Sequence, residues 1–532
     1  MTIRLVGRKS EGREPIMVNR VARRRRGLAL VRCGIPVLFV GCLLLINLSD
    51  FPPTWFDEGL NVSAAGMLAR DGVYGLPDST GPRVMDAAIQ TGPIVIVPVA
   101  LAFGLFGTEL LTARLVAVTF ALLALWLFWR LAGQSFDRET AAVAAAILLV
   151  GNSDGYTSFL YMGRQVLGEV PGLAFFSLGM LAILRGLGAS GCGRGRVPSA
   201  ILAGLAWGGA ITTKSQLLVL LPAAISTVCV ADLLFYRRRS WSLLALSLAV
   251  GLVCVFGWYL TQYAVLGLEQ FRRNAAVASE GLSLHIIGLE WAHVRNAIGV
   301  IWRSGFVAWG FPGLAWALWL ARTRDAIGYR QFLLLSMPLI ALFWFVVLSI
   351  GWSRYAFYPF ALLPMWTGHW LISLGRRFLP PSRRYAAGIL AAVVLIVPLA
   401  MSGLTWSRGL VWPSANGFER MRSYLKTQVP VGALVESWEW QFSLDARQPI
   451  RHPDTRTANS ATRAIFTLKT APDHLYDNSQ PLPDYVLEGP FSAWTGIYRE
   501  LIAERGRQIV VFQPYALYRI TPLSVSHGTT QR

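Results

Sequence analysis

Two adjacent carboxylates, Asp57 and Glu58, form the stretch of the sequence best suited to chemistry. They follow residues 28–48, a nearly uncharged run about as long as the ~20 residues that cross a bilayer as a helix. Neighbouring side chains point to opposite sides of an extended chain and do not share one face of a helix. We therefore expect one carboxylate to serve catalysis and the other to hold the local structure. The structural alternative is that Asp57 caps a helix over residues 58–69.

Further charged side chains are expected at the outer ends of apolar segments, where a charge is costly and is a candidate for function by default. A transfer reaction on an anionic lipid needs a carboxylate to deprotonate the acceptor and cations to hold the phosphate leaving group. We expect Asp57 and Glu58 to be the catalytic pair, with Glu169 and Asp154 as supporting acidic residues. The residues expected to bind the donor phosphate and its lipid are Arg114, Arg164, Lys214, Arg354 and Tyr355.

Most of these charges have structural alternatives. Arg114, at the start of its span, could simply extend its guanidinium to the interface. Arg164 and Glu169 lie five residues apart around a helix start, and a local ion pair would explain both. A functional role is favoured for Lys214, the only basic residue in a very short outer turn where positive charge is disfavoured. The same holds for Arg354, the only charge in its outer loop.

The composition is that of a polytopic membrane protein. Of the 532 residues, 54% are hydrophobic and 15% are charged, whereas a soluble domain carries about 25% charged residues. The formal net charge is +20, but the arginines cluster at the ends of apolar segments, where they indicate topology. We therefore expect membrane lipid, and no nucleic acid, as a partner. Neither the five cysteines nor the six histidines show metal-ligand spacing.

Basic clusters placed on the cytoplasmic side divide the chain into about eleven spans. Residues 1–27 are then a cytoplasmic basic segment, and residues 28–406 form the transmembrane module of a protein in a bacterial inner membrane. The predicted spans are 28–48, 112–131, 140–152, 166–187, 199–213, 217–235, 242–262, 297–320, 331–349, 356–375 and 386–406.

The remaining segments are expected outside the membrane. The first outer loop, residues 49–111, contains the apolar run 93–106, which is too short to cross and is expected to be an interfacial or re-entrant helix. The loop 263–296 is expected to form an amphipathic helix on the outer surface. Residues 407–532 are predicted to be a small extracytoplasmic α/β domain. Its expected strands are 433–436, 485–487 and 508–512, and its expected helices lie near 415–427 and 495–505.

Several short motifs, taken in order, resemble a known family. They are Trp55-Phe56-Asp57-Glu58-Gly59, Thr91-Gly92-Pro93-Ile94, Phe106-Gly107-Thr108-Glu109-Leu110, Ala113-Arg114-Leu115, Gly168-Glu169-Val170-Pro171, Thr213-Lys214 and Arg354-Tyr355. The set is similar to the dolichyl-phosphate-mannose–protein mannosyltransferases and their bacterial relatives, including the lipid A aminoarabinose transferases. These are glycosyltransferase family 39-like members of the GT-C superfamily. The resemblance covers about residues 28 to 375.

The resemblance implies a GT-C-like helical bundle that transfers a sugar from a polyprenyl-phosphate carrier to a protein, lipid or glycan at the outer membrane face, with inversion. It implies that Asp57 is the catalytic carboxylate, that Glu58 is its acidic partner and that Arg114 is the arginine opening the second span. Bacterial relatives usually carry Glu-Lys-Pro-Pro where this chain has Gln90-Thr91-Gly92-Pro93. One metal ligand and one lipid-phosphate contact of those relatives are therefore missing, and a divalent metal remains only an option.

Two other classes of function compete with a glycosyltransferase. A transporter or flippase of an envelope lipid or sugar also needs charges in the membrane. Transporters, however, tend to show internal repeats and broken helices at mid-membrane, whereas this sequence shows no repeat and its charges lie at outer edges. A non-catalytic assembly protein of envelope synthesis would have no deep outer cavity converging on Asp57.

Overall fold

The structure is a computed structural model that describes residues 40–188, 195–236, 240–285, 289–322, 328–378, 417–454 and 481–521, with a few further residues between 396 and 463. Residues 1–46 and residues 47–532 form two separate compact units. In the first unit, residues 40–45 are helical. The predicted spans 28–48 and 386–406 fall largely outside the described residues.

Five helical segments in the described part of the chain are long and apolar enough to cross a membrane. They confirm as helices the spans predicted at 112–131, 166–187, 217–235, 242–262 and 331–349. The segments are α4 (Leu110–Ser135), α7 (Glu169–Gly188), α9 (Gln216–Ala231) with the π-helical turn η2 (Asp232–Tyr236), the first part of α10 (Trp241–His285), and α13 (Tyr329–Phe343) with the π-helical turn η3 (Trp344–Leu348).

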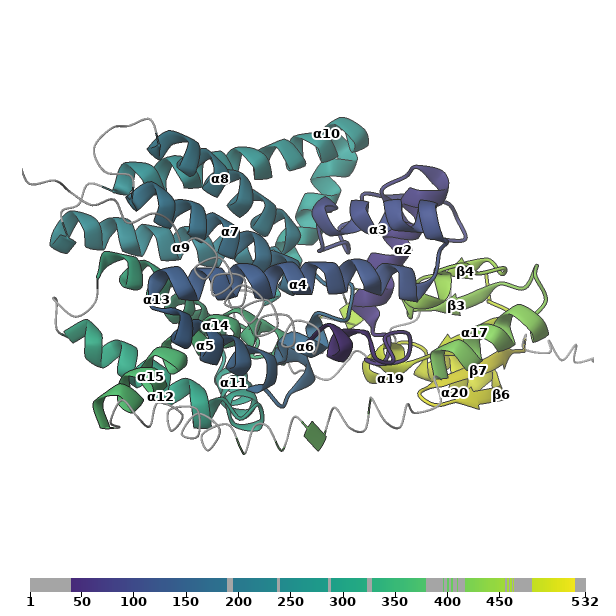
Figure 1. The fold of residues 1–532 in the computed structure, drawn as a ribbon. Coiled ribbons are helices and arrows are strands. Elements are labelled where there is room, and N and C mark those ends of the chain that lie inside the picture. Colours follow the sequence, from purple (N-terminus) through teal and green to yellow (C-terminus); the bar gives the residue numbers. More distant parts are fainter. Residues whose placement is uncertain are drawn as a thin grey trace, which may run out of the picture. The chain divides into compact units, whose positions relative to one another are not determined.

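Other predicted spans are helical but shorter or broken. Two of them are α5 (Arg138–Val150) and α8 (Arg196–Thr213), and α8 packs between α7 and α10 (Figure 1). The span predicted at 297–320 is wrong as a single helix, because α11 (Trp291–Arg303) and α12 (Phe306–Arg322) meet at a bend of 100°. Gly305, at φ 75°, allows the left-handed turn there. The span at 356–375 is divided into α14 (Phe357–Leu362) and α15 (Pro364–Phe378).

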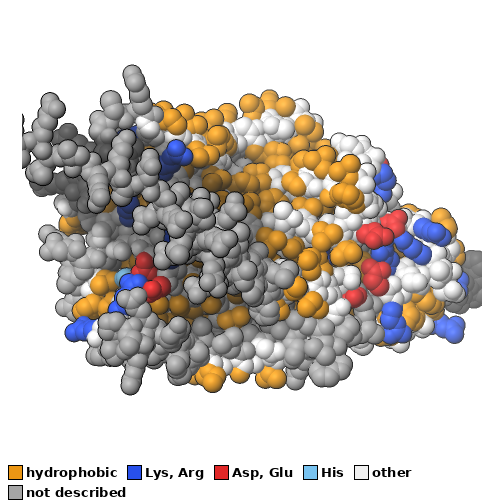
Figure 2. Space-filling model, viewed as in Figure 1, with side chains coloured by type: hydrophobic (Ala, Val, Ile, Leu, Met, Phe, Trp, Pro, Cys, Tyr) orange, Lys and Arg blue, Asp and Glu red, His pale blue; other side chains and the backbone are white. Residues whose placement is uncertain are grey.

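The described residues thus contain five apolar spans, or six if the bent pair counts as one, against eleven predicted for the whole chain. The surface of these helices is largely hydrophobic. Leu105, Trp126 and Phe256 are each more than half exposed, and Figure 2 shows hydrophobic side chains over much of the helical part. A helix that is apolar on its exposed face suits a lipid environment. The membrane-protein class inferred from composition is confirmed.

The first outer loop folds into α2 (Phe56–Asp71), the antiparallel strands β1 (Gly75–Leu76) and β2 (Arg83–Val84), and α3 (Pro93–Phe106). Helix α3 has the bounds predicted from the apolar run, with proline at its first position. Trp55 precedes the first residue of α2 as its N-cap, so Asp57 lies inside the helix. The alternative in which Asp57 caps this helix is therefore wrong. In the loop predicted at residues 263–296, α10 continues as a helix past a kink at Gly267.

The C-terminal region contains a five-stranded sheet in the order β4-β3-β5-β7-β6. Strand β3 pairs in parallel with β4 and β5, whereas β7 is antiparallel to β5 and β6. The predicted α/β character is confirmed, but β4 and β7 were not predicted. The strands are β3 (Val435–Ser437), β4 (Ile450–Arg451), β5 (Tyr485–Glu488), β6 (Gly506–Phe512) and β7 (Tyr515–Ile520), and the helices are α17 (Gly417–Gln428), α19 (Pro490–Thr495) and α20 (Arg499–Arg505).

The first outer loop and the C-terminal sheet share one hydrophobic core. Leu60 of α2 and Ile96 of α3 belong to the same buried cluster as Phe418 of α17, Val435 of β3 and Leu517 of β7. At the edge of this core, the Ser63 hydroxyl donates to the carbonyl of Trp440, in the 3-10 turn η6 (Trp440–Ser443), at 2.7 Å. The C-terminal sheet is thus anchored on the helix that carries Asp57.

Candidate active site

Four charged side chains from distant parts of the chain form one continuous set of ion pairs. Asp57 pairs with Nη1 of Arg354, which lies in the 3-10 turn η4 (Ser353–Ala356). Nη2 of Arg354 lies 2.9 Å from Oε1 of Glu169, the first residue of α7. Nζ of Lys214 lies 2.9 Å from that same oxygen. We call Asp57, Arg354, Glu169 and Lys214 the charged cluster.

The members of the charged cluster differ in their access to solvent. Glu169 is fully buried, and Lys214 and Arg354 are at least nine-tenths buried, whereas the side chain of Asp57 is 29% exposed. The indole Nε1 of Trp55 donates to Oδ2 of Asp57 at 2.6 Å, which fixes the carboxylate a second time. Buried charges are tolerated only when they are paired. Glu169 therefore holds the two cations in place, and Asp57 is the member open to a ligand.

Two glycines of the motifs bring these elements together by close backbone approach. A Cβ on Gly92, just before α3, would lie 1.7 Å from the carbonyl oxygen of Thr212, and a Cβ on Gly168 would lie 2.3 Å from that of Thr213. Both segments therefore pack directly on the end of α8, which stops at Thr213, one residue before Lys214. This packing places Glu169, the residue after Gly168, within reach of Lys214.

Glu58 occupies very different surroundings from those of its neighbour Asp57. It forms a fully buried two-point pair with Arg114 of α4, with Nε 2.9 Å from Oε1 and Nη2 2.6 Å from Oε2. Arg114 also donates to the carbonyls of Leu48 and Pro52, both at 2.8 Å. The idea that Arg114 extends to the interface is wrong, because the side chain is completely buried. The pair ties the start of α2 to α4.

Arg164 does not form the local pair that its spacing from Glu169 indicated. Its guanidinium donates to the carbonyl of Phe51 at 2.8 and 3.1 Å and lies over the Phe51 ring, while Glu169 pairs with the charged cluster instead. The amide of Asn61 donates to the carbonyl of Val166 at 2.7 Å. These contacts hold the segment before α7 against α2 and the residues that precede it, and they help to fix the position of Asp57 on that helix.

Asp154 and Tyr355 lie beside the charged cluster. Asp154 starts the 3-10 turn η1 (Gly155–Thr157), accepts from the backbone N–H of Tyr156 at 3.0 Å, and accepts from the hydroxyl of Ser353 at 2.8 Å. It therefore positions the residue before Arg354. Tyr355 is in the cavity wall next to Arg354, and burial raises the pKa of its hydroxyl. The Tyr355 hydroxyl thus stays protonated and available as a donor.

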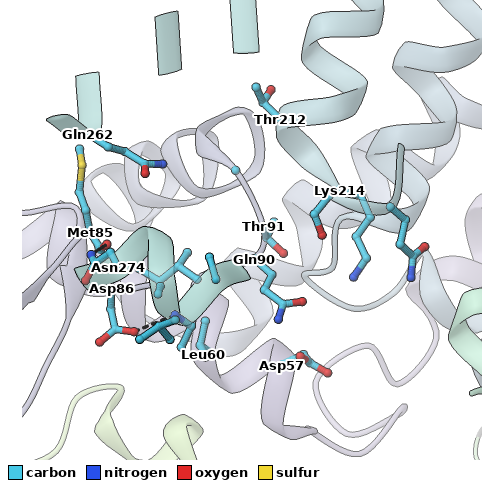
Figure 3. Close-up of a pocket in the computed structure, with 18 of the residues that line it drawn as sticks. Asp57, Leu60, Met85, Asp86, Gln90, Thr91, Thr212, Lys214, Gln262 and Asn274 are labelled. Carbon is cyan, nitrogen blue, oxygen red and sulfur yellow. Dashed lines mark hydrogen bonds between the residues drawn. The ribbon is translucent and has the colours of Figure 1, made fainter. Parts of the chain in front are cut away.

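The charged cluster opens into a cavity of about 350 Å³, called here the first cavity. Its wall includes Asp57, Lys214 and Arg354, and it extends between the first outer loop and the residues Val255 and Trp258 of α10. Figure 3 shows Asp57 of α2 and Lys214 facing the space around Gln90. A partly apolar cavity with a few convergent charged groups is a typical binding site for a small ligand.

Several residues of this wall were not predicted from the sequence. Gln90 and Asp86 come from the loop between β2 and α3 (Figure 3), and Trp438, Trp440 and Phe491 come from the C-terminal region. The spacing of Trp438 and Trp440 beside a predicted strand was the only available signal for the C-terminal contribution. Within the described residues, no group of three or more His, Cys, Asp or Glu side chains is placed to hold a metal ion.

Comparison with known proteins shows what the chain is similar to in family and in fold. Residues 91–260 match the family model described as dolichyl-phosphate-mannose-protein mannosyltransferase. Over that stretch the chain is similar to this family. The matched region includes Gly92, Arg114, Glu169 and Lys214, and it confirms the resemblance drawn from the motifs. No curated protein sequence matches the chain.

Solved structures match most of the chain at low identity. ArnT from Cupriavidus metallidurans, bound to undecaprenyl phosphate, has 16% identity and a TM-score of 0.60, and the match covers 92% of this chain and 98% of that one. Its apo state has 15% identity and a TM-score of 0.59, with the same coverage. The archaeal oligosaccharyltransferase AglB from Archaeoglobus fulgidus, in complex with an inhibitory peptide and a dolichol-phosphate, has 11% identity and a TM-score of 0.56, covering 95% of this chain and 75% of that one. The predicted GT-C fold is confirmed.

Proposed function

We propose that this protein transfers a sugar from a polyprenyl-phosphate carrier to an acceptor hydroxyl at the extracytoplasmic face of a bacterial inner membrane, with Asp57 as the base. The observation that carries the proposal is the charged cluster, in which one accessible carboxylate, Asp57, adjoins two buried cations, Arg354 and Lys214. The match to a structure bound to undecaprenyl phosphate supports the class of donor.

The cations suit the leaving group of such a reaction. Lys214 and Arg354 both line the first cavity, and fixed cations in a largely water-excluded site stabilise charge that develops on a phosphate oxygen. Asp57 and Glu169 neutralise these two cations in the free protein, so a phosphate that enters the cavity competes with Asp57 for Arg354. Donor binding would therefore release the Asp57 carboxylate from its ion pair and free it to accept a proton.

The transfer is then a single displacement. The acceptor oxygen forms a bond to the anomeric carbon of the sugar while the bond from that carbon to the phosphate oxygen breaks. The acceptor proton passes to Asp57, and the polyprenyl phosphate leaves with the electron pair, held by Lys214 and Arg354. Attack on the face opposite the phosphate inverts the configuration at the anomeric carbon. Glu58, which is buried against Arg114, acts here as a positioning residue for α2.

The proposal is tested by measuring sugar transfer in membrane vesicles supplied with labelled polyprenyl-phosphate sugars. We expect transfer by the wild type and a loss of about 10²–10⁴-fold in Asp57→Asn, the usual contribution of a general base. Asp71→Asn is the matched control, because Asp71 is an exposed residue at the other end of the same helix. Equal transfer by the wild type and Asp57→Asn would overturn the catalytic role of Asp57. If the wild type consumed none of the polyprenyl-phosphate sugars, the proposed class of donor would be overturned.

A further inference from the structure

A second cavity meets the first at the charged cluster. Its volume is about 300 Å³, at the lower end of the roughly 300–1,000 Å³ of small-ligand sites. The two cavities share Trp55, Trp352 and Arg354 in their walls. The second cavity therefore reaches Arg354, the ion-pair partner of Asp57, by a route different from that of the first cavity.

Four aromatic side chains, Trp55, Tyr156, Trp352 and Trp494, line the second cavity. The rings of Trp352 and Trp494 have centroids 5.6 Å apart at an angle of 42°, and Trp55 and Tyr156 are related similarly, at 5.6 Å and 57°. Trp494, in α19, is 50% exposed. Large aromatic rings bury much of their surface when they pack in a protein, so a half-exposed indole at a cavity wall is suited to contact with a ligand.

Polar groups surround these rings. Asn296 and Arg303 of α11 and Ser353 of η4 also line the second cavity. Asp154 accepts from both the Ser353 hydroxyl and the Tyr156 backbone N–H, so one carboxylate orients a polar and an aromatic part of the same wall. Amide, hydroxyl and guanidinium groups next to flat rings match a ligand that carries many hydroxyls on a ring with an apolar C–H face. An acyl chain would leave these polar groups without partners.

We propose that the second cavity binds the acceptor, and that the acceptor is a saccharide whose ring stacks on Trp352 and Trp494. This proposal rests on the proposed function and names its acceptor class. The hydroxyl that reacts lies at the shared wall by Trp55 and Arg354. From there its oxygen bonds to the anomeric carbon of the donor in the first cavity, its proton goes to Asp57, and the sugar–phosphate bond breaks.

The test is saturation-transfer NMR on the full-length protein in lipid nanodiscs, because a sugar-headed detergent would compete. The probes are methyl α-mannopyranoside and methyl β-glucopyranoside, with a serine- and threonine-containing peptide as the competing acceptor class. We expect saturation of the glycoside ring protons by the wild type and a fall of roughly three- to tenfold in Trp494→Ala. Trp494→Phe keeps an aromatic face and should retain most of the signal.

Trp319→Ala is the matched control, because Trp319 is 51% exposed on α12 and does not line either cavity. Its signal should equal that of the wild type. Asp57→Asn should still bind the glycosides although it does not transfer, so loss of acceptor binding and loss of the catalytic role are separate results. No glycoside signal with the wild type, an unchanged signal in Trp494→Ala, or a signal from the peptide alone would overturn the saccharide proposal.

Discussion

Oε1 of Glu169 lies 2.9 Å from both Nζ of Lys214 and Nη2 of Arg354, so one buried carboxylate oxygen holds two cations. Those cations in turn face the cavity that Asp57 lines. The relationship joins residues from three distant segments, and it explains how two positive charges can be kept buried and close together in the absence of a phosphate.

Glu169→Gln is expected to destabilise the protein by about 3–5 kcal/mol, because it leaves Lys214 and Arg354 buried with a single carboxylate between them. The measurement is the thermal unfolding of the wild type and the variant in nanodiscs. Glu504→Gln is the control, since Glu504 is exposed in α20 and should change stability by no more than about 0.5 kcal/mol. An unchanged unfolding midpoint for Glu169→Gln would contradict the role assigned to this carboxylate.

The Glu58–Arg114 pair is expected to behave as a structural unit. Glu58→Gln or Arg114→Met alone leaves one buried charge without its partner, at a cost of about 3–5 kcal/mol each. The double variant should cost less than the sum, because it removes both charges. The coupling is measured by a double-mutant cycle, from the unfolding midpoints of the wild type, the two single variants and the double variant. Strictly additive losses would show that the two residues act independently.

Gly92→Ala is expected to impair donor binding, because the new methyl group would lie 1.7 Å from the carbonyl oxygen of Thr212 and must push α3 away from the end of α8. That movement displaces Lys214, two residues later. Gly104→Ala in the same helix meets nothing within 4 Å and should be neutral or slightly stabilising. The measurement is the KM for the lipid-linked donor, which should rise at least about tenfold in Gly92→Ala and stay constant in Gly104→Ala.

Acid should destabilise the C-terminal region through His452. Burial, aided by the nearby Arg83 guanidinium, lowers the pKa of His452 to about 3, below the ordinary value of about 6.5. The stability contributed by the neutral ring is therefore fully present above a pH of about 6.5 and is lost as the pH falls towards about 3. The loss amounts to as much as about 1.4 kcal/mol for each pH unit.

The contacts of the His452 ring explain this preference for the neutral form. Nδ1 lies 2.6 Å from the carbonyl oxygen of Ser437, to which it donates, and Nε2 lies 2.6 Å from the Ser443 hydroxyl, from which it accepts. Unfolding midpoints measured between pH 7.5 and pH 5 should fall for the wild type and fall less steeply for His452→Gln. Parallel curves for the two proteins would show that another group controls the acid sensitivity.

Local sequence signals predicted the elements whose ends are marked by glycine or proline. Helix α3 was predicted with correct bounds because Gly92, Pro93 and Gly107 delimit its apolar run. The bend between α11 and α12 was missed, since a single left-handed residue, Gly305, interrupts an otherwise continuous apolar pattern. Strand β4, with two residues, is too short to show any periodicity.

The residues of the candidate site were predicted from the sequence, but the ion pairs between them were not. The charges of Asp57, Glu169, Lys214 and Arg354 were recognised as costly in an apolar setting. Which carboxylate pairs with which cation depends on contacts between residues up to 297 positions apart, and no local pattern contains that information. The structural alternative in which Arg164 pairs with Glu169 is wrong for this reason. The C-terminal part of the cavity wall was missed because it carries no recognised motif.

The roles of Asp57 and of the two cations are tested most directly by measuring undecaprenyl phosphate binding and sugar transfer on the same purified preparation of Asp57→Asn. We expect the variant to bind the lipid phosphate at least as tightly as the wild type, because Lys214 and Arg354 remain and Arg354 no longer faces a competing carboxylate. Transfer should be lost. Transfer at the wild-type rate, or loss of lipid phosphate binding in the correctly folded variant, would contradict the assignment of Asp57 as the base and of the two cations as the phosphate site.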